Sequence, residues 1–483
     1  MKPSSDVSTE DDDQRLPRLT HRTRYRRYFG KLSTIATSGA DCRNQERPLA
    51  QPNNPITCLA FADDLVLIAD DAAHLQDLLD VCSRTAEKEG MKFSREKTNI
   101  MKIGDDTPGP RFFLQNEEVK DTTSYTYLGI QIESKEDYLL EHEQDLLRKM
   151  NKKEGHSWHL ARHSFNPYEI GRLHWKTTAV PAATYANEAI SYSKTTMDQL
   201  ERQQRELGRW LLQGSFATPN PAIEGELGWS TYSFREARSK TNFLGRAIHG
   251  PEQAYITRVF RYLRFTGVKI HWIKKIKQID RVYSIGTKRH TATNQKEWTR
   301  ITRKELHQTE SQRWTSSVAR RKSMARYGEN KTSPAPERFY WGDRASGLLF
   351  QARTGSLPTR KRISELFSSD NPVCTLCDTG EEEDLEHILR SCPALEKTRN
   401  PNHYPTKVLL GFQTGANEED EPQIATTKRH LLAWEKATRL RKANTDRIWQ
   451  GNTDLPTSQD SEDAESEKED ADEPPEGQQR RRR

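Results

Sequence analysis

The sequence has few apolar residues for its length. The chain of 483 residues is 33% hydrophobic and 30% charged. Adding the 25 glycines raises the apolar share only to about 38%, whereas a globular domain usually reaches roughly 45–50% by that definition. This composition excludes one compact, core-rich enzyme over the whole length. At ~150 residues per domain we expect about three units.

A long apolar run is also missing. No stretch approaches the ~20 apolar residues that a membrane-spanning helix needs. Residues 1–13, MKPSSDVSTEDDD, lack the basic and apolar regions of a secretion signal. We therefore expect an intracellular protein of the nucleus or cytoplasm, or both, that is not secreted and has no membrane partner. The oligomeric state stays open.

Cysteine is scarce and unevenly placed. There are six, and the last three lie close together: Cys42, Cys58, Cys82, Cys374, Cys377 and Cys392. In a reducing compartment such a cluster indicates metal binding before a disulfide framework.

Both ends of the chain offer almost no apolar side chains, so we expect residues 1–54 and the acidic tail 451–483 to be disordered. The remainder predicts an α+β fold that is mostly α. The expected regions are 55–135 with strands and one helix, 136–250 with helices, 251–369 with basic helices, a Cys/His module at 370–395, and a helical segment at 396–450 with one helix near 427–446.

Two adjacent carboxylates interrupt the run ITCLAFADDLVLIAD at residues 56–70. The flanking residues are apolar and favour strands, so the pattern predicts a tight hairpin with Asp63 and Asp64 at its tip. Like charges between strands are costly unless a cation neutralises them. The alternative is an acidic, solvated turn without a metal.

The order of elements continues regularly after this turn. A helix is predicted over Asp77–Lys88 and ends near Gly90, and a strand follows Lys97-Thr98. The segment SYTYLGIQI then predicts two strands that meet at Leu128-Gly129. The whole order is hairpin, helix, strand and strand pair.

This order resembles the second half of a reverse transcriptase palm, most closely that of non-LTR (LINE-type) retrotransposons. Residues 61–64 resemble the catalytic FADD box, residues 90–98 the G-x6-K-T segment, and Tyr127-Leu128-Gly129 the primer-grip box. The resemblance implies Mg²⁺ held by Asp63 and Asp64, with an RNA template and a DNA target or primer as partners. It also directs Lys97 toward the departing phosphates.

Each of these roles has a simpler alternative. Lys97 could be an ordinary surface lysine, and Leu128-Gly129 a β-turn with a buried leucine. The third Asp of the family's active site and its template-gripping loop have no counterpart upstream. We therefore expect an N-terminally truncated palm that does not polymerise by itself.

The middle of the chain predicts packed helices. Met197, Leu200, Leu207 and Leu211 recur at helical intervals. The segment TPNPAIEGELGW at 218–229 is expected to form a loop and turn. This region resembles the thumb and the part that follows it in the family.

Residues 258–326 hold 19 Lys and Arg against four Asp and Glu. The interleaved aromatic residues are Tyr262, Phe265, Trp272, Tyr283, Trp298, Trp314 and Tyr327. Basic groups neutralise phosphates and aromatic rings stack on unpaired bases, so we expect this region to bind RNA or a single strand. The alternative is solvated helix faces with buried aromatics. The candidate contacts are Lys274, Lys275, Lys277, Arg320, Arg321 and Lys322.

The segment CTLCDTGEEEDLEHILRSC matches a structural Zn²⁺ site in ligand type and spacing. The predicted ligands are Cys374, Cys377, His387 and Cys392, with His387 on a helix over residues 382–389. The alternative is three unrelated buried cysteines. A similar CCHC element in non-LTR retrotransposon proteins, with the pattern E-H-x-L/I-x-x-C, implies contact with nucleic acid.

Together these features predict the C-terminal part of a non-LTR retrotransposon protein whose family activity is RNA-directed DNA synthesis by two-metal nucleotidyl transfer. The rival hypothesis is a non-catalytic RNA- or DNA-binding remnant that uses the basic helices and the zinc module.

Overall fold

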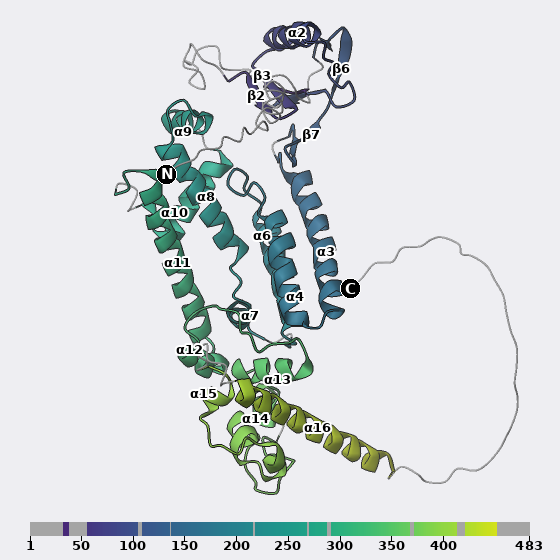
Figure 1. The fold of residues 1–483 in the computed structure, drawn as a ribbon, viewed down its shortest axis with the longest axis vertical. Coiled ribbons are helices and arrows are strands. Elements are labelled where there is room, and N and C mark those ends of the chain that lie inside the picture. Colours follow the sequence, from purple (N-terminus) through teal and green to yellow (C-terminus); the bar gives the residue numbers. More distant parts are fainter. Residues whose placement is uncertain are drawn as a thin grey trace, which may run out of the picture.

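The structure is a computed structural model, and it describes residues 32–37, 56–104, 109–135, 137–215, 218–267, 270–286, 291–367, 371–412 and 421–451. This part of the chain is α+β and mostly helical, as the sequence predicts. A small layer of strands lies at one end of a column of long helices, and the C-terminal helices and loops of the described chain form the other end (Figure 1).

Eight strands form two sheets. Their bounds are β1 Leu32–Thr37, β2 Cys58–Phe61, β3 Asp64–Ala69, β4 Asn99–Ile103, β5 Phe112–Leu114, β6 Glu117–Asp121, β7 Ser124–Tyr127 and β8 Ile130–Glu133 among the described residues. The larger sheet has the order β2-β3-β1-β4-β6-β5, and β7 pairs with β8 alone. β1 is parallel to both of its neighbours, β3 and β4, and β2 and β3 form an antiparallel hairpin.

Strand β1 differs from the expectation that residues 1–54 contain no element. Residues 32–37 form a strand at the centre of the sheet, between β3 and β4. The sequence LSTIAT is short but β-prone, and two parallel neighbours complete its hydrogen bonding. The other residues of 1–54, and the tail after residue 451, lie outside the described part of the chain.

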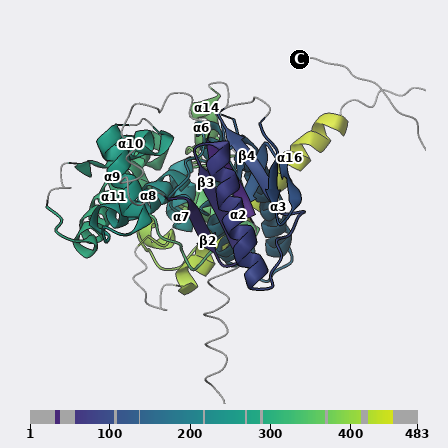
Figure 2. The same ribbon diagram turned by 90° about the horizontal axis from the view of Figure 1, so that it is seen from above.

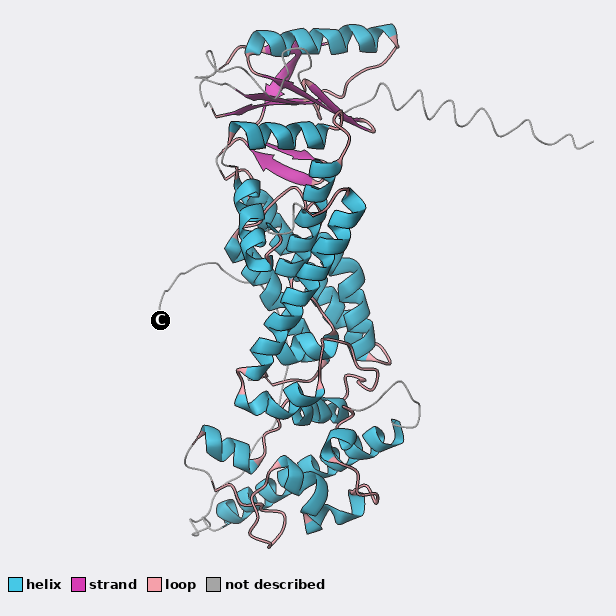
Figure 3. Ribbon diagram, turned by 90° about the vertical axis from the view of Figure 1, so that its left-hand side faces the viewer, coloured by secondary structure: helices cyan, strands magenta, loops and turns pink. Residues whose placement is uncertain are grey.

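Helix α2 (Ala72–Lys88) covers the outer face of the larger sheet (Figure 2). Asp71 begins this helix by accepting a hydrogen bond from the backbone N–H of His74 at 2.8 Å. Leu75 and Leu79 from the helix join Leu67 and Ile100 from the sheet in one apolar cluster. The opposite face of the sheet turns toward the helical column (Figure 3).

The helices of the column and the far end have the following bounds: α3 Leu140–Arg162, α4 Pro167–His174, η1 Trp175–Ala179, α5 Val180–Ala183, α6 Lys194–Leu211, α7 Asn220–Leu227, α8 Tyr232–His249, α9 Tyr255–Thr266, α10 His271–Tyr283, α11 Gln295–Ala319, η3 Lys322–Met324, α12 Ala325–Asn330, α13 Arg344–Arg353, α14 Arg360–Leu366, η4 His387–Ser391, η5 Pro393–Thr398, α15 Thr406–Leu409 and α16 Glu421–Gly451. None of the helices in the described ranges is long and apolar enough to cross a bilayer.

One large core connects most of these helices. It runs from Leu139, just before α3, to Trp434 on α16. It includes Ile388 and Leu389, which are next to the predicted zinc ligand His387. A second cluster joins α8, α10 and α11 around Trp298. The Cys/His segment is therefore packed onto the helical body through this shared core.

The expected loop at 218–229 is wrong. Asn220–Leu227 forms helix α7, and Pro221 through Leu227 are all buried. Pro221 fits because it lies in the first turn of the helix, where its missing N–H has no partner to lose. Gly228 ends α7 in the left-handed conformation, with φ of +63°. Proline and glycine thus mark the ends of a short helix here.

The predicted helices are otherwise present with different bounds. The helix expected over Asp77–Lys88 begins five residues earlier, at Ala72. The one expected near 427–446 extends over Glu421–Gly451. The helix expected over residues 382–389 is wrong at its start, because Glu382 forms a β-bridge with Val373 and the helical turns begin at residue 385.

Candidate functional site

The carboxylate turn has the predicted hairpin geometry. Ala62 and Asp63 form the two-residue turn between β2 and β3, with Phe61 paired to Asp64. Ala62 adopts φ of +51°, the left-handed conformation that tight hairpin turns require. Asp63 is exposed and Asp64 is half-buried. The Oδ1 atom of Asp64 is buried and has no hydrogen-bond partner among the described residues, which leaves it available to a cation.

The sheet register brings Lys97 to the same end of the sheet as this turn. Val66 and Asn99 both pair with Ser33 of β1. Asp64 begins β3, and Lys97 lies in the turn that precedes β4, so both residues are at the same end of the sheet. The side chain of Lys97 is exposed.

Tyr127 lies close to the turn as well. Burial raises the pKa of the Tyr127 hydroxyl, and the nearby Asp64 carboxylate and Cys58 thiol raise it further. The hydroxyl therefore stays protonated and is able to donate a hydrogen bond at neutral pH. The structure thus places Tyr127 beside Asp64, with Lys97 at the same end of the sheet.

Leu128 and Gly129 form the turn between β7 and β8. Both adopt left-handed backbone conformations, with φ of +49° and +81°. The hydroxyl of Tyr185, in the helical column, donates a hydrogen bond of 2.7 Å to the carbonyl of Leu128. The predicted primer-grip turn is therefore attached to the column, and Leu128 is only half-buried.

Among the residues that the structure describes, no third ligand joins the Asp63-Asp64 pair. Across the described ranges, one group of three or more His, Cys, Asp and Glu side chains is close enough to share an ion, and it is the Cys/His cluster. Thr37, the carboxyl end of β1, lies beyond the level of Ala69, at the far end of the sheet from the turn. The described part of β1 therefore brings no carboxylate to Asp64.

The four predicted zinc ligands do converge. The ligand atoms of Cys374, Cys377, His387 and Cys392 all lie within 4.8 Å of one another. Sulfur atoms bound tetrahedrally to zinc at ~2.3 Å are about 3.8 Å apart, so the cluster has the size of such a site. Cys374, His387 and Cys392 are buried. The residues therefore fit a structural Zn²⁺ ion with no open position for a substrate.

The histidine ligand is oriented by a residue that the sequence interpretation missed. The Nδ1 atom of His387 lies 2.7 Å from Oε2 of Glu381, and its Nε2 atom lies 3.4 Å from the Cys377 sulfur. A carboxylate on the outer nitrogen fixes the tautomer and leaves Nε2 for the metal. An acidic residue six positions before the histidine, in GEEEDLEH, is the signal that could have indicated it.

The cluster is also supported from α16. The Nε2 atom of His430 lies 2.7 Å from the carbonyl of Ile388, and its Nδ1 atom lies 2.9 Å from the hydroxyl of Thr398. Arg326 of α12 forms an ion pair of 2.7 Å with Glu386, next to the histidine ligand. The metal-type site is thus held between α12 and α16.

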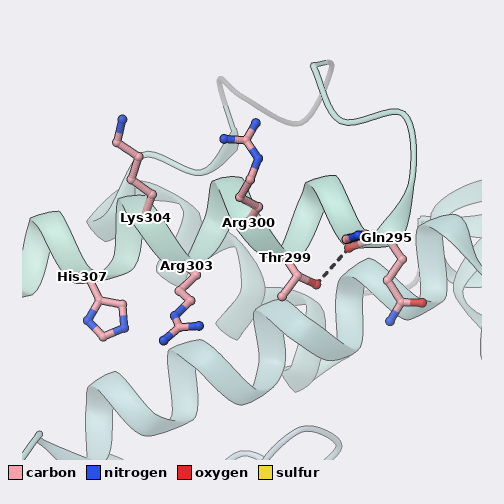
Figure 4. A pocket seen from close by; sticks show the side chains of 7 residues that line it. Gln295, Thr299, Arg300, Arg303, Lys304 and His307 are labelled. Carbon is pink, nitrogen blue, oxygen red and sulfur yellow. Dashed lines mark hydrogen bonds between the residues drawn. The ribbon is translucent and has the colours of Figure 1, made fainter.

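Seven residues of α11 form a basic surface around a pocket. Its side chains are Gln295, Lys296, Thr299, Arg300, Arg303, Lys304 and His307. Figure 4 shows Arg300 and Lys304 on one side of the helix and Arg303 and His307 on the other. Burial lowers the pKa of His307, and Arg238 and Arg303 lower it further. The four-residue spacing of Lys296, Arg300 and Lys304 is the signal that was missed.

The six predicted nucleic-acid contacts do not form one patch. Lys274, Lys275 and Lys277 lie on α10, and Lys275 forms an ion pair of 2.9 Å with the buried Glu236 of α8. Arg320, Arg321 and Lys322 are exposed at the end of α11. Glu236 is two residues from Phe234, whose ring contacts His307. The two groups are therefore separated by about 13 residues of α11, or roughly 20 Å.

The prediction that these aromatic residues stack on bases is wrong for most of them. Trp298, Trp314, Tyr327 and Tyr283 are all at least 95% buried. Trp314 and Tyr327 contact each other edge to face, and Trp314 donates a hydrogen bond to the carbonyl of Pro221. Trp298 and Trp314 lie on α11, Tyr283 on α10 and Tyr327 on α12, and all four rings belong to the two apolar clusters of the core.

The comparisons support the interpretation of the strand layer. A family model described as reverse transcriptase (RNA-dependent DNA polymerase) matches residues 33–132. No curated protein matches the chain. The match begins in β1 and ends in β8, so it spans the sheet, α2 and the β7–β8 turn. This segment is therefore similar to a reverse transcriptase domain, a class that implies a nucleic-acid template.

Proposed function

We propose that the chain carries part of the catalytic domain of an RNA-directed DNA polymerase of the non-LTR retrotransposon class. The observation that supports this most directly is the hairpin turn with Asp63 and Asp64, which has Tyr127 beside Asp64 and lies within the segment that matches the reverse transcriptase family. The Cys/His cluster is consistent with the class but is separate from this chemistry.

The residues at the turn fit a divalent cation. Hard cations such as Mg²⁺ prefer carboxylate oxygens, and Asp63 and Asp64 offer two carboxylates, one with an unpartnered oxygen. When bound, two such ions lower the pKa of a primer hydroxyl and stabilise the leaving pyrophosphate. Lys97 adds a positive charge for the departing phosphates, and Tyr127 supplies a hydrogen-bond donor beside Asp64.

We also propose that the chain does not polymerise by itself. In this class the metal ions are held by three carboxylates, and the described residues bring two to the turn. Positioning supplies most of the rate enhancement in metal-assisted transfer, so an incomplete ligand set lowers the rate by several orders of magnitude.

Primer extension on an RNA template with Mg²⁺ tests this proposal. The 483-residue chain should give no extension, and a chain extended upstream by a reverse transcriptase segment with the first Asp box should give extension. The variants Asp63→Asn and Asp64→Asn should abolish that activity. Asp70→Asn, at the other end of β3, is the matched control and should retain it.

Two results would contradict the proposal. Activity of the chain alone that is lost in Asp64→Asn would show that a third ligand exists in it. Activity of the extended chain that survives both substitutions would exclude the FADD turn from catalysis.

A second candidate function is nucleic-acid binding without catalysis. It is favoured by the surface on α11, where Lys296, Arg300, Arg303 and Lys304 lie on one helix. Each phosphate contact with a single strand contributes about −0.7 to the slope of log K against log salt. The double variant Arg300→Gln/Lys304→Gln should therefore reduce that slope by about 1.4. Lys149→Gln on α3, an exposed lysine paired with Asp145, is the control that should leave it unchanged.

A further inference from the structure

Helix α9 (Tyr255–Thr266) has an outer face that carries three aromatic rings and an arginine. Tyr255, Arg258, Tyr262 and Phe265 follow one another at intervals of three, four and three residues, so they align along one side of the helix. Phe265 is 85% exposed and Tyr255 is 53% exposed, and Arg258 and Tyr262 between them are half-buried. We call this set the α9 ladder.

The ladder is exposed because α9 packs through its other side. Phe260 contacts the ring of Trp272 on α10, and the centres of the two rings are 6.5 Å apart. Large aromatic side chains dominate protein cores and binding surfaces, and an aligned exposed set is a mark of a binding surface. Packing among the described residues therefore does not explain why these aromatic rings are aligned on an outer face.

The charge of α9 indicates the kind of partner. Residues 255–266, YITRVFRYLRFT, contain Arg258, Arg261 and Arg264 and no acidic residue. The guanidinium of Arg258 lies 5.8 Å from the centre of the Tyr255 ring. Arg261 forms an ion pair of 2.9 Å with Glu252, and Arg264 is exposed. Aromatic rings alternating with arginines suit a partner that carries many negative charges and has planar groups that stack on aromatic rings.

We propose that the α9 ladder binds single-stranded nucleic acid by stacking unpaired bases on Phe265, Tyr262 and Tyr255. Arg258, which lies within the ladder, neutralises a phosphate that accompanies these bases. Ten residues of helix separate the first and last rung by about 15 Å, which accommodates several nucleotides. A duplex is a poor partner because its base faces are already stacked on one another.

The position of the ladder is consistent with this role. Helix α9 lies at the end of the helical column nearest to the strand layer (Figure 1). It is separate from the α11 surface and from the Cys/His cluster, since neither includes a residue of α9. The ladder adds stacking to the proposed nucleic-acid function and does not require that the FADD turn be catalytic.

Binding of the full chain to fluorescein-labelled oligouridylate, measured by fluorescence anisotropy, tests the ladder. Phe265→Ala should weaken binding about tenfold and leave the salt slope unchanged, since stacking carries no charge. Phe265→Trp should restore binding, and Phe265→Leu should not. Arg258→Gln should reduce the slope by about 0.7. Phe165→Ala is the matched control, because Phe165 is 83% exposed and lies away from α9.

A 2-aminopurine base in the oligonucleotide gives an independent readout. Its fluorescence should be quenched on binding by stacking on the ladder, and Phe265→Ala should reverse the quenching. The proposal is overturned if Phe265→Ala binds like the original chain or like Phe165→Ala, or if Phe265→Leu keeps full affinity. It is also overturned if Phe265→Ala weakens binding to duplex RNA as much as binding to the single strand. The same holds if Phe265→Ala weakens binding to anionic vesicles and leaves binding to RNA unchanged.

Discussion

Arg353 and Glu226 form an ion pair of 3.0 Å, and both side chains are completely buried. Arg353 is at the end of α13 and Glu226 is on α7, so the pair joins two helices that are distant in the sequence. The hydroxyl of Tyr340 donates a hydrogen bond of 2.8 Å to the same glutamate, and the Arg353 guanidinium lies 4.1 Å from the centre of the Phe412 ring. The column and the Cys/His end are thus connected through one buried charge network.

Removing one member of this pair should strongly destabilise the protein. Arg353→Met leaves Glu226 charged and buried without its partner, which we expect to lower the free energy of unfolding by about 3–5 kcal/mol. Arg344→Met, on the same helix, is the control, because Arg344 is 40% exposed beside Glu435. That change should cost less than about 1 kcal/mol. Urea unfolding followed by tryptophan fluorescence measures both, and equal midpoints would contradict the prediction.

The purified chain should hold one zinc ion. Four soft or borderline ligands converge within 4.8 Å, and each would otherwise be a buried polar group with few partners. Elemental analysis should give about one zinc per chain, and Cys377→Ser should reduce it below half. Cys82→Ser on α2, outside the cluster, is the control that should keep full zinc. A zinc content near zero in the original chain would exclude the site.

Glu381 should tune the affinity of this site without being a ligand. Its carboxylate accepts from His387 Nδ1 at 2.7 Å. Loss of such an outer partner typically weakens metal binding about 10- to 100-fold. We expect this effect for Glu381→Gln in a competition with a chromophoric chelator. Glu382→Gln, the neighbouring exposed acid that pairs with Lys361, should behave like the original chain. Equal affinities for both variants would contradict the role of Glu381.

The features that the sequence predicts well are those with a fixed spacing. The Asp63-Asp64 hairpin and the Cys/His ligand set each occupy a short segment, so residue type and local geometry determine them. The β7–β8 turn at Leu128-Gly129 is predicted for the same reason.

The features that it misses depend on contacts between distant segments. The sequence around Glu226 predicts a polar turn residue, and only the fold shows that Glu226 is buried in contact with Arg353 and Tyr340. The strand at residues 32–37 is recognisable only when β3 and β4 flank it. The aromatic residues of α11 alternate with basic ones in the sequence, and only the packing against α7 and α8 shows which side is buried.

The stability of the protein should fall between pH 4.5 and pH 7 because of Glu154 on α3. Burial and, to a smaller extent, the nearby Glu206 carboxylate together raise the pKa of this carboxyl from 4.5 to about 7. Its Oε1 atom is buried and has no hydrogen-bond partner among the described residues. In this range the folded chain binds a proton that the unfolded chain has released. The free energy of unfolding therefore decreases as the pH rises through the window.

Glu154→Gln should remove this dependence, because glutamine is neutral at every pH. Relative to the original chain, the variant should be equally stable near pH 4 and more stable near pH 8. The difference at pH 8 should be at most about 3 kcal/mol, because each tenfold difference in proton affinity corresponds to ~1.4 kcal/mol. Glu206→Gln replaces an exposed carboxylate. It should give only the smaller part of the stability gain at pH 8, the part that comes from charge repulsion with Glu154. Urea unfolding across the pH range measures all three chains. If Glu154→Gln is less stable than the original chain at pH 8, the carboxylate makes a favourable interaction when ionised, and burial does not control its titration.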